Sequence, residues 1–167
     1  SVAWGNRRAT VHARTLPLFR SVFQDRSKRW LLANAKYDMH ILANVGVILE
    51  GPVVDIQVMH ALLYEDRPHG LKDIASHILG WKWSDFQDTF GRISVKQNAE
   101  ALIRRAEAEN FNLLIEYAAN DAWGTLEGGR QLKIQLEKVH TNSLFSVIPP
   151  CINTLWDLFD KTEVPYT

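Results

Sequence analysis

The 167-residue chain carries 19 basic and 19 acidic side chains, and this balance argues against a large basic surface of the kind with which proteins usually hold duplex DNA, while permitting a small acidic site that takes a few nucleotides. Its length is enough for one domain with a sizeable core, and a hydrophobic content of 46% argues against a disordered chain. The single cysteine, Cys151, excludes an internal disulfide and fits a reducing compartment, and no apolar run approaches the roughly 20 residues of a membrane span.

Short strands and helices are predicted in the first half of the chain. Ser1–Trp4 and Thr10–Ala13 flank a turn and predict a β-hairpin, and Pro17 begins a short helical stretch that ends near Phe23. The apolar run Trp30–Ala33 has the length of a buried strand. A helix is expected to begin at Asp38 and to end at Gly46.

The next segments alternate in the same way. Pro52–Val54 predicts a strand, and Asp55 is placed to cap a helix that runs to about Leu63. Apolar residues at helical spacing predict a further helix from Leu71 to Leu79, closed by Gly80. Short strands followed by many helices indicate an α/β or α+β architecture with a small sheet.

The clearest helical stripe lies in the second half of the chain. Its members are Phe111, Leu114, Ile115, Ala118, Ala119, Ala122 and Leu126. Tyr117 and Asp121 fall at the edge of this stripe, where a side chain can face a cleft. Gly128–Gly129 is expected to weaken or bend the helix before it continues to about His140, and a final amphipathic helix is predicted over Ile152–Asp160.

Two short motifs carry the candidate chemistry, Asn34-Ala-Lys-Tyr-Asp38 and Tyr117-Ala-Ala-Asn-Asp121. Taken singly, Asp38 is most simply a helix cap and Tyr117 with Asp121 a surface pair one turn apart. Two aspartates brought together from distant segments would instead form a site for a divalent cation, and a nearby tyrosine could orient a water molecule. Those groups suit metal-dependent phosphodiester hydrolysis.

Taken in order, the motifs resemble a known family. Asn34–Leu63, His69–Ala75, Tyr117–Ala122 and Val147–Val164 closely resemble the 3′–5′ proofreading exonuclease domain of family A DNA polymerases, the bacterial DNA polymerase I enzymes and their phage relatives. The resemblance covers nearly the whole chain. It implies an α/β, RNase H-like fold with a small mixed sheet flanked by helices. It also implies an exonuclease domain over residues 1–145 and a junction helix over 146–167 that leads into a polymerase domain.

The resemblance also implies roles for individual residues. Asp38 would help to hold the outer metal ion and Asp121 the inner one, both Mg²⁺ or Mn²⁺, and Tyr117 would hydrogen-bond the attacking water. Asn34 and Tyr37 would line the path of the frayed 3′ strand. Arg67 and His69 would also bind the nucleic acid. The implied partners are the single-stranded 3′ end of DNA and the polymerase domain of the same parent chain, without a membrane, in the cytoplasm of a bacterium or of a phage-infected cell.

One motif of the family does not occur in the 167 residues. The first motif, Asp-x-Glu, supplies two of the four carboxylates and precedes a strand and turn that look like Ser1–Gly5. We therefore expect truncation at the amino end, with the first strand missing, and little or no exonuclease activity from this chain. A non-catalytic scaffold of the same fold and an RNase D-like RNA exonuclease are the alternative functions. The polymerase-like segment Val147–Val164 counts against the second.

Overall fold

A computed structural model describes residues 1–83, 104–105 and 107–142 of the chain. The helix expected over Ile152–Asp160 and the junction segment 146–167 lie outside the described residues. The strands are β1 (Val2–Trp4), β2 (Arg7–Ala9), β3 (Trp30–Leu32) and β4 (Val53–Asp55). The helices are the 3-10 helix η1 (Ala13–Phe19), α1 (Arg20–Phe23), α2 (Ala35–Asn44), α3 (Ile56–Leu63), α4 (Leu71–Leu79) and α7 (Phe111–Asn142).

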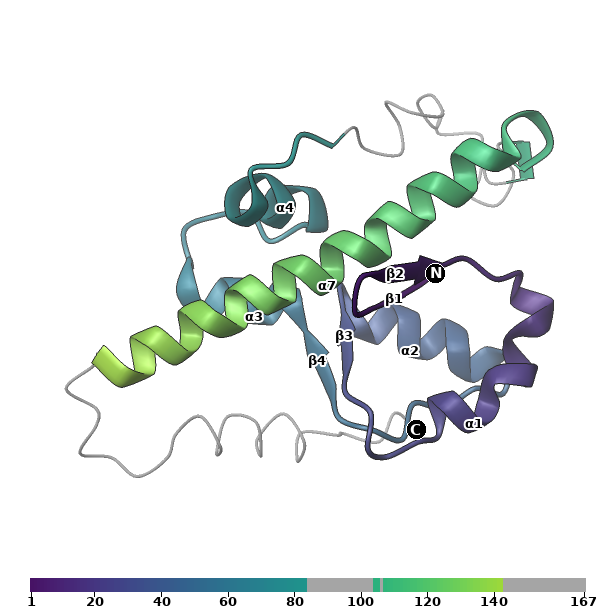
Figure 1. Ribbon diagram of the computed structural model, residues 1–167, viewed down its shortest axis with the longest axis horizontal. Helices are drawn as coiled ribbons and strands as arrows, with labels where there is room; N and C mark the ends of the chain where they lie inside the picture. The colour runs from purple at the N-terminus through teal and green to yellow at the C-terminus, as the bar shows by residue number, and fades with distance from the viewer. Residues whose placement is uncertain (84–103, 106, 143–167) are drawn as a thin grey trace.

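The strands form two small separate sheets in a mixed α/β arrangement (Figure 1). β1 and β2 are antiparallel, and β3 and β4 are parallel, with Trp30 opposite Val53. Antiparallel and parallel pairs are both present, as a mixed sheet would require, but in the described residues they do not join into one sheet. The second hairpin strand begins at Arg7 and not at Thr10, because Gly5 takes a positive φ of 54° and closes a two-residue turn.

The parallel pair β3–β4 lies between two hydrophobic clusters, as the two-residue period of a strand dictates. Leu31 and Val54 face a cluster that includes Ile56, Ile74 and Leu132, each of them fully buried, from α3, α4 and α7. On the opposite face, neighbouring residues of both strands pack against the second cluster. That cluster contains Phe23, Val47 and Leu49, with Trp30, Leu32, Met39, Leu42 and Val53 against it. Burial on both faces explains why Trp30–Leu32 reads as a continuous apolar run.

Helix α7 spans the molecule and packs against α3, α4 and the β1–β2 hairpin (Figure 1). It continues without interruption through Gly128–Gly129, contrary to the expected weak point. A Cβ atom on Gly129 would lie 2.9 Å from Leu31 Cδ1 and 3.1 Å from Ile56 Cγ2. The glycine is therefore needed for a close approach of the helix to the sheet, and packing there compensates for the low helix propensity of glycine.

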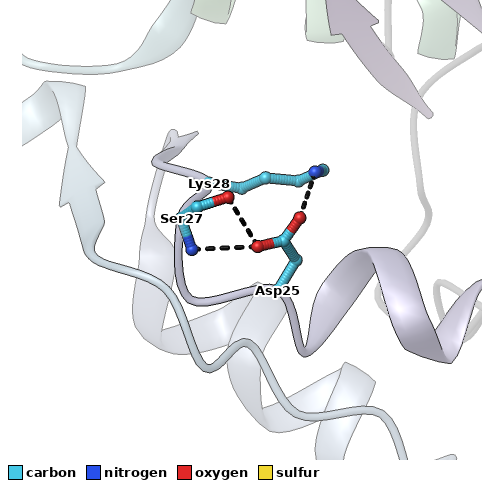
Figure 2. Close-up of polar contacts among 3 residues, drawn as sticks. All are labelled: Asp25, Ser27 and Lys28. Atoms are coloured by element: carbon cyan, nitrogen blue, oxygen red, sulfur yellow. Dashed lines mark hydrogen bonds and ion pairs between the residues drawn. The ribbon is translucent and has the colours of Figure 1, made fainter.

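A tight turn precedes β3 (Figure 2). One oxygen of Asp25 accepts hydrogen bonds from the Ser27 backbone nitrogen at 2.9 Å and from the Ser27 hydroxyl at 2.6 Å, and the other pairs with Lys28. The ammonium of Lys28, followed by the Ser27 donors, lowers the pKa of Asp25 from 3.8 to about 2. Gly51 packs against this turn, since its Cβ would lie only 2.0 Å from the Lys28 carbonyl oxygen. The segments that lead into β3 and β4 are thereby held together.

Candidate active site

Asp38 lies in the first turn of α2 and does not cap it, because the helix begins three residues earlier than expected. The N-cap is Asn34, whose backbone is left-handed (φ 65°) and whose side chain makes no capping hydrogen bond. The carboxylate of Asp55 takes over that function. It accepts from the backbone nitrogens of Asn34 at 3.2 Å and Ala35 at 2.8 Å.

The same Asp55 carboxylate caps α3, as the sequence predicts, by accepting a hydrogen bond from the backbone nitrogen of Gln57 at 2.9 Å. From the carboxyl end of β4, Asp55 therefore accepts hydrogen bonds from backbone N–H groups at the amino ends of two helices, which would otherwise lack partners. Its contacts fix where α2 starts, and so fix the position of Asp38. Asn34 and Tyr37 are exposed on the same segment as Asp38, the tyrosine side chain being 63% exposed.

Tyr117 and Asp121 lie one turn apart on α7, and both are half-buried. Most of the predicted apolar stripe is half-buried as well, and Phe111, expected inside, is half exposed at the first residue of the helix. They border a pocket of about 150 Å³. Its lining residues are Lys72, Trp83, Leu113, Glu116, Tyr117, Asn120 and Asp121. Lys72, on α4, forms an ion pair with Asp121.

Asp38 and Asp121 share one charged neighbour, the residue that precedes β1. The nitrogen of Ser1 interacts electrostatically with both carboxylates, and burial lowers the pKa of that amino group. Burial likewise raises the pKa of Asp38 and of Asp121, opposed at Asp121 mainly by Lys72. A carboxylate whose charge is disfavoured by burial gains from a cation beside it. The two predicted metal-binding aspartates, on helices α2 and α7, therefore share an electrostatic neighbour, the Ser1 nitrogen.

The hairpin that carries Ser1 is fixed to α7 along its length. The Thr10 hydroxyl bonds the Ser1 hydroxyl at 2.6 Å and donates to the carbonyl oxygen of Ile115 at 3.4 Å. Farther along the helix, Arg130 donates to the carbonyl oxygen of Gly5 at 3.1 Å. The hairpin is therefore aligned with α7, the helix that carries Asp121.

Arg67 and His69, predicted to contact DNA, belong to the connection between α3 and α4. His69 Nδ1 lies 2.8 Å from Nδ1 of the fully buried His60, whose Nε2 lies 3.0 Å from His77 Nδ1. The guanidinium of Arg67 is exposed and lies 6.0 Å from the Tyr64 ring centroid. His69 thus takes part in a chain of three histidines that ties the connection to both helices.

Two features of this region were not predicted as parts of the site. Lys72 belongs to the His69–Ala75 segment that carries part of the resemblance, but nothing in its spacing marks it as a partner of Asp121. The histidine chain has no Cys/His spacing typical of zinc sites. Both features arise only when α4 packs against α3 and α7.

Carboxylate oxygens are the donor type that a magnesium ion prefers. Within residues 1–83, 104–105 and 107–142, no group of three or more histidine, cysteine or acidic side chains is arranged to hold a metal. Mg²⁺, however, is commonly held by one or two carboxylates together with substrate phosphates. Asp38 and Asp121 are two such donors, and both are half-buried.

Comparison with known proteins places this mixed α/β domain in the class of 3′-5′ exonucleases. A family model with that description matches residues 3–138. The chain belongs to this family, the exonuclease domain family of family A DNA polymerases. A search of curated proteins found no match. None of the described helices combines the length and apolar character needed to cross a membrane.

Proposed function

We propose that the chain is a proofreading domain of RNase H-like fold that removes nucleotides from the 3′ end of DNA by two-metal-ion hydrolysis. The observation that carries this proposal is that Asp38 and Asp121 both interact electrostatically with the Ser1 nitrogen, with Tyr117 one turn from Asp121. Family membership supports the reaction class, and the half-buried carboxylates support a cation at this point. The proposed partner is the polymerase domain of the same parent chain.

Each residue of the site has a proposed task. Asp38 and Asp121 would hold Mg²⁺ or Mn²⁺, which stabilises the negative charge on the attacking and leaving oxygens of the phosphodiester. Tyr117 orients the attacking water through its hydroxyl, which can donate and accept hydrogen bonds without adding charge. Neither aspartate needs to act as a base, because their shared role is to concentrate negative charge where the cation binds.

The substrate strand is proposed to run over the first turn of α2. Asn34 and Tyr37 are exposed there. Asn34 offers an amide for hydrogen bonding, and Tyr37 offers a ring on which a base can stack. Arg67 is exposed on the α3–α4 connection and would contact a phosphate. His69 is proposed to act on the strand through this same connection, which its contact with His60 holds in place.

The site of the 167-residue chain is proposed to be incomplete. The chain has no Asp-x-Glu, so half of the family's carboxylates are not among its residues. The absence of Asp-x-Glu, together with the ion pair between Lys72 and Asp121, favours the second candidate, a non-catalytic scaffold beside a polymerase.

The test is hydrolysis of 3′-labelled single strands of DNA and RNA with Mg²⁺ or Mn²⁺. It compares the 167-residue chain with a form that begins upstream of Ser1 in the source gene. We expect weak cleavage by the first form and DNA trimming by the second. Asp121→Asn should lower the rate at least about 100-fold, since even indirect support of a metal ligand is worth 10- to 100-fold. Tyr117→Phe should slow trimming without abolishing binding of the strand.

The other outcomes select the alternatives. No cleavage by the longer form, with binding of the strand retained, would indicate the scaffold. Preference for RNA would indicate an RNase D-like enzyme. Robust cleavage by the 167-residue chain that depends on Asp121 would contradict the proposed incompleteness.

A further inference from the structure

Lys72, on α4, occupies a pocket formed by α7 and by the segment after α4 that carries Trp83. Its ammonium pairs with Asp121 and lies 4.2 Å from the ring centroid of Trp83 and 4.5 Å from that of Tyr117. Only 25% of the Lys72 side chain is exposed. Two aromatic faces and a carboxylate are the surroundings that favour a cation most strongly, because the ring quadrupoles and the carboxylate attract the same charge.

The pocket is itself held by close packing. Trp83 lies against Gly124, where a Cβ atom would be 2.1 Å from the Trp83 ring. The Trp83 and Trp81 rings pack edge to face, with centroids 5.6 Å apart. The lysine therefore sits in a formed pocket and does not simply extend along an open surface.

The ammonium uses the carboxylate that the proposed function assigns to a metal ion. A divalent cation on that carboxylate would stand next to a positive charge in a partly desolvated pocket, where like charges repel strongly. Lysine and metal ion therefore compete for Asp121. Without a metal ion, Lys72 neutralises a carboxylate that would otherwise be half-buried and unpaired.

We propose that Lys72 is an exchangeable counter-cation of Asp121, displaced by the divalent metal ion and setting its apparent affinity. The inference rests on the proposed function, because it needs a metal ion at Asp121. Lys72 is a positioning residue in this proposal. It keeps Asp121 charged and oriented when no metal ion is bound, and it raises the metal concentration at which half of the sites are occupied.

Manganese binding tests the proposal directly. Electron paramagnetic resonance would follow the loss of free Mn²⁺ signal as the 167-residue chain is titrated. Lys72→Met should bind Mn²⁺ about tenfold more tightly than the parent, the equivalent of one hydrogen bond to a charged group. Asp121→Asn should abolish this site in both backgrounds. The control is Lys133→Met on α7, the helix that carries Asp121. Lys133 pairs with Glu137 at 3.7 Å, and its replacement should leave the Mn²⁺ affinity unchanged.

The Mn²⁺ titration has three other possible outcomes. Equal Asp121-dependent affinities of Lys72→Met and parent would overturn the counter-cation role and leave the proposed metal site standing. Equal gains in Lys72→Met and Lys133→Met would show a general charge effect and overturn it too. Binding that does not depend on Asp121 would contradict both the inference and the metal site of the proposed function.

A second measurement needs no substitution. The ε-methylene protons of Lys72 lie near two aromatic rings, so ring currents should shift their NMR signal upfield in the metal-free protein. Mg²⁺, which is diamagnetic, should move that signal as the ammonium leaves Asp121. A Lys72 signal that stays fixed while Mg²⁺ perturbs the Asp121 amide would overturn the exchange.

Discussion

The carboxylate of Asp55 accepts a hydrogen bond from the backbone nitrogen of Ala35 at 2.8 Å, which joins the end of β4 to the start of α2. The same group also accepts from Asn34 and Gln57. One side chain therefore anchors the turn that carries Asp38.

Asp55→Ala should destabilise the fold by about 2–3 kcal/mol, because hydrogen bonds to a charged acceptor and a helix cap are lost together. Urea denaturation followed by circular dichroism measures the change. Asp55→Ser is the matched variant, since one hydroxyl can still cap α3 at Gln57 but cannot also reach α2. It should recover about 1 kcal/mol of the loss, the usual worth of an N-cap. Equal stability of the two variants would contradict the double role of Asp55.

Gly124 and Gly128 provide a matched pair on α7. A Cβ on Gly124 would lie 2.1 Å from the Trp83 ring, whereas one on Gly128 would lie 3.4 Å from Ile74 Cγ2, an ordinary contact. Gly124→Ala should displace Trp83 and destabilise the protein by about 1–3 kcal/mol, the usual cost of overpacking. Gly128→Ala should be neutral or stabilising by up to about 1 kcal/mol through helix propensity. Thermal denaturation of both variants checks the contrast, which similar melting temperatures would refute.

Asp25 should make stability depend on acid pH. Its pKa in the folded chain is about 2, below its ordinary value of 3.8, so the folded state favours the charged form. The resulting stabilisation is complete above pH 3.8 and disappears as the pH falls through 2. The stability difference between the parent and Asp25→Asn should therefore shrink between pH 5 and pH 2. Carbon-13 NMR titration of the carboxyl group gives the pKa itself, which Lys28→Met should raise, and an unchanged value would count against the Lys28 contact.

His60 should make stability depend on pH in a higher range. Burial, then the neighbouring His69 and His77, and then Arg67 lower the pKa of His60 below 6.5, with Asp73 opposing. The unfolded chain therefore binds more protons below about pH 6.5, and stability falls as the pH drops through that value. The urea midpoint should decrease more between pH 7.5 and pH 5.5 in the parent than in His60→Leu. Parallel pH profiles would show that His60 does not carry the effect.

The sequence predicted elements wherever a local rule operates. Asp55 at its helix cap, Gly80 at its left-handed C-cap and the run at Trp30 are found as expected, because capping and burial leave short-range patterns. The start of α2 was predicted at Asp38 because a local rule favours a capping aspartate. The actual cap comes from Asp55, twenty residues away from Ala35, and no local pattern reveals it.

The residues of the candidate site also fall into two groups, those that a pattern along one helix predicts and those that only helix packing brings together. Tyr117 and Asp121 were predicted because both lie on one helix at a fixed spacing, and their nearness to each other needs no tertiary information. Lys72 enters the site only through the packing of α4 on α7, and the histidine chain only through the packing of α4 on α3. Charged and aromatic neighbours of this kind depend on the approach of whole helices.

Helix α7 carries Tyr117 and Asp121 near one end and the fully buried Leu132 farther along. Leu132 follows Asp121 by eleven residues, about 16 Å of helix. Under the proposed function, a genetic screen for loss of exonuclease activity would therefore recover alleles at Leu132 or Gly129 beside those at Asp121. Such alleles would resemble active-site lesions in phenotype while leaving every reacting group in place.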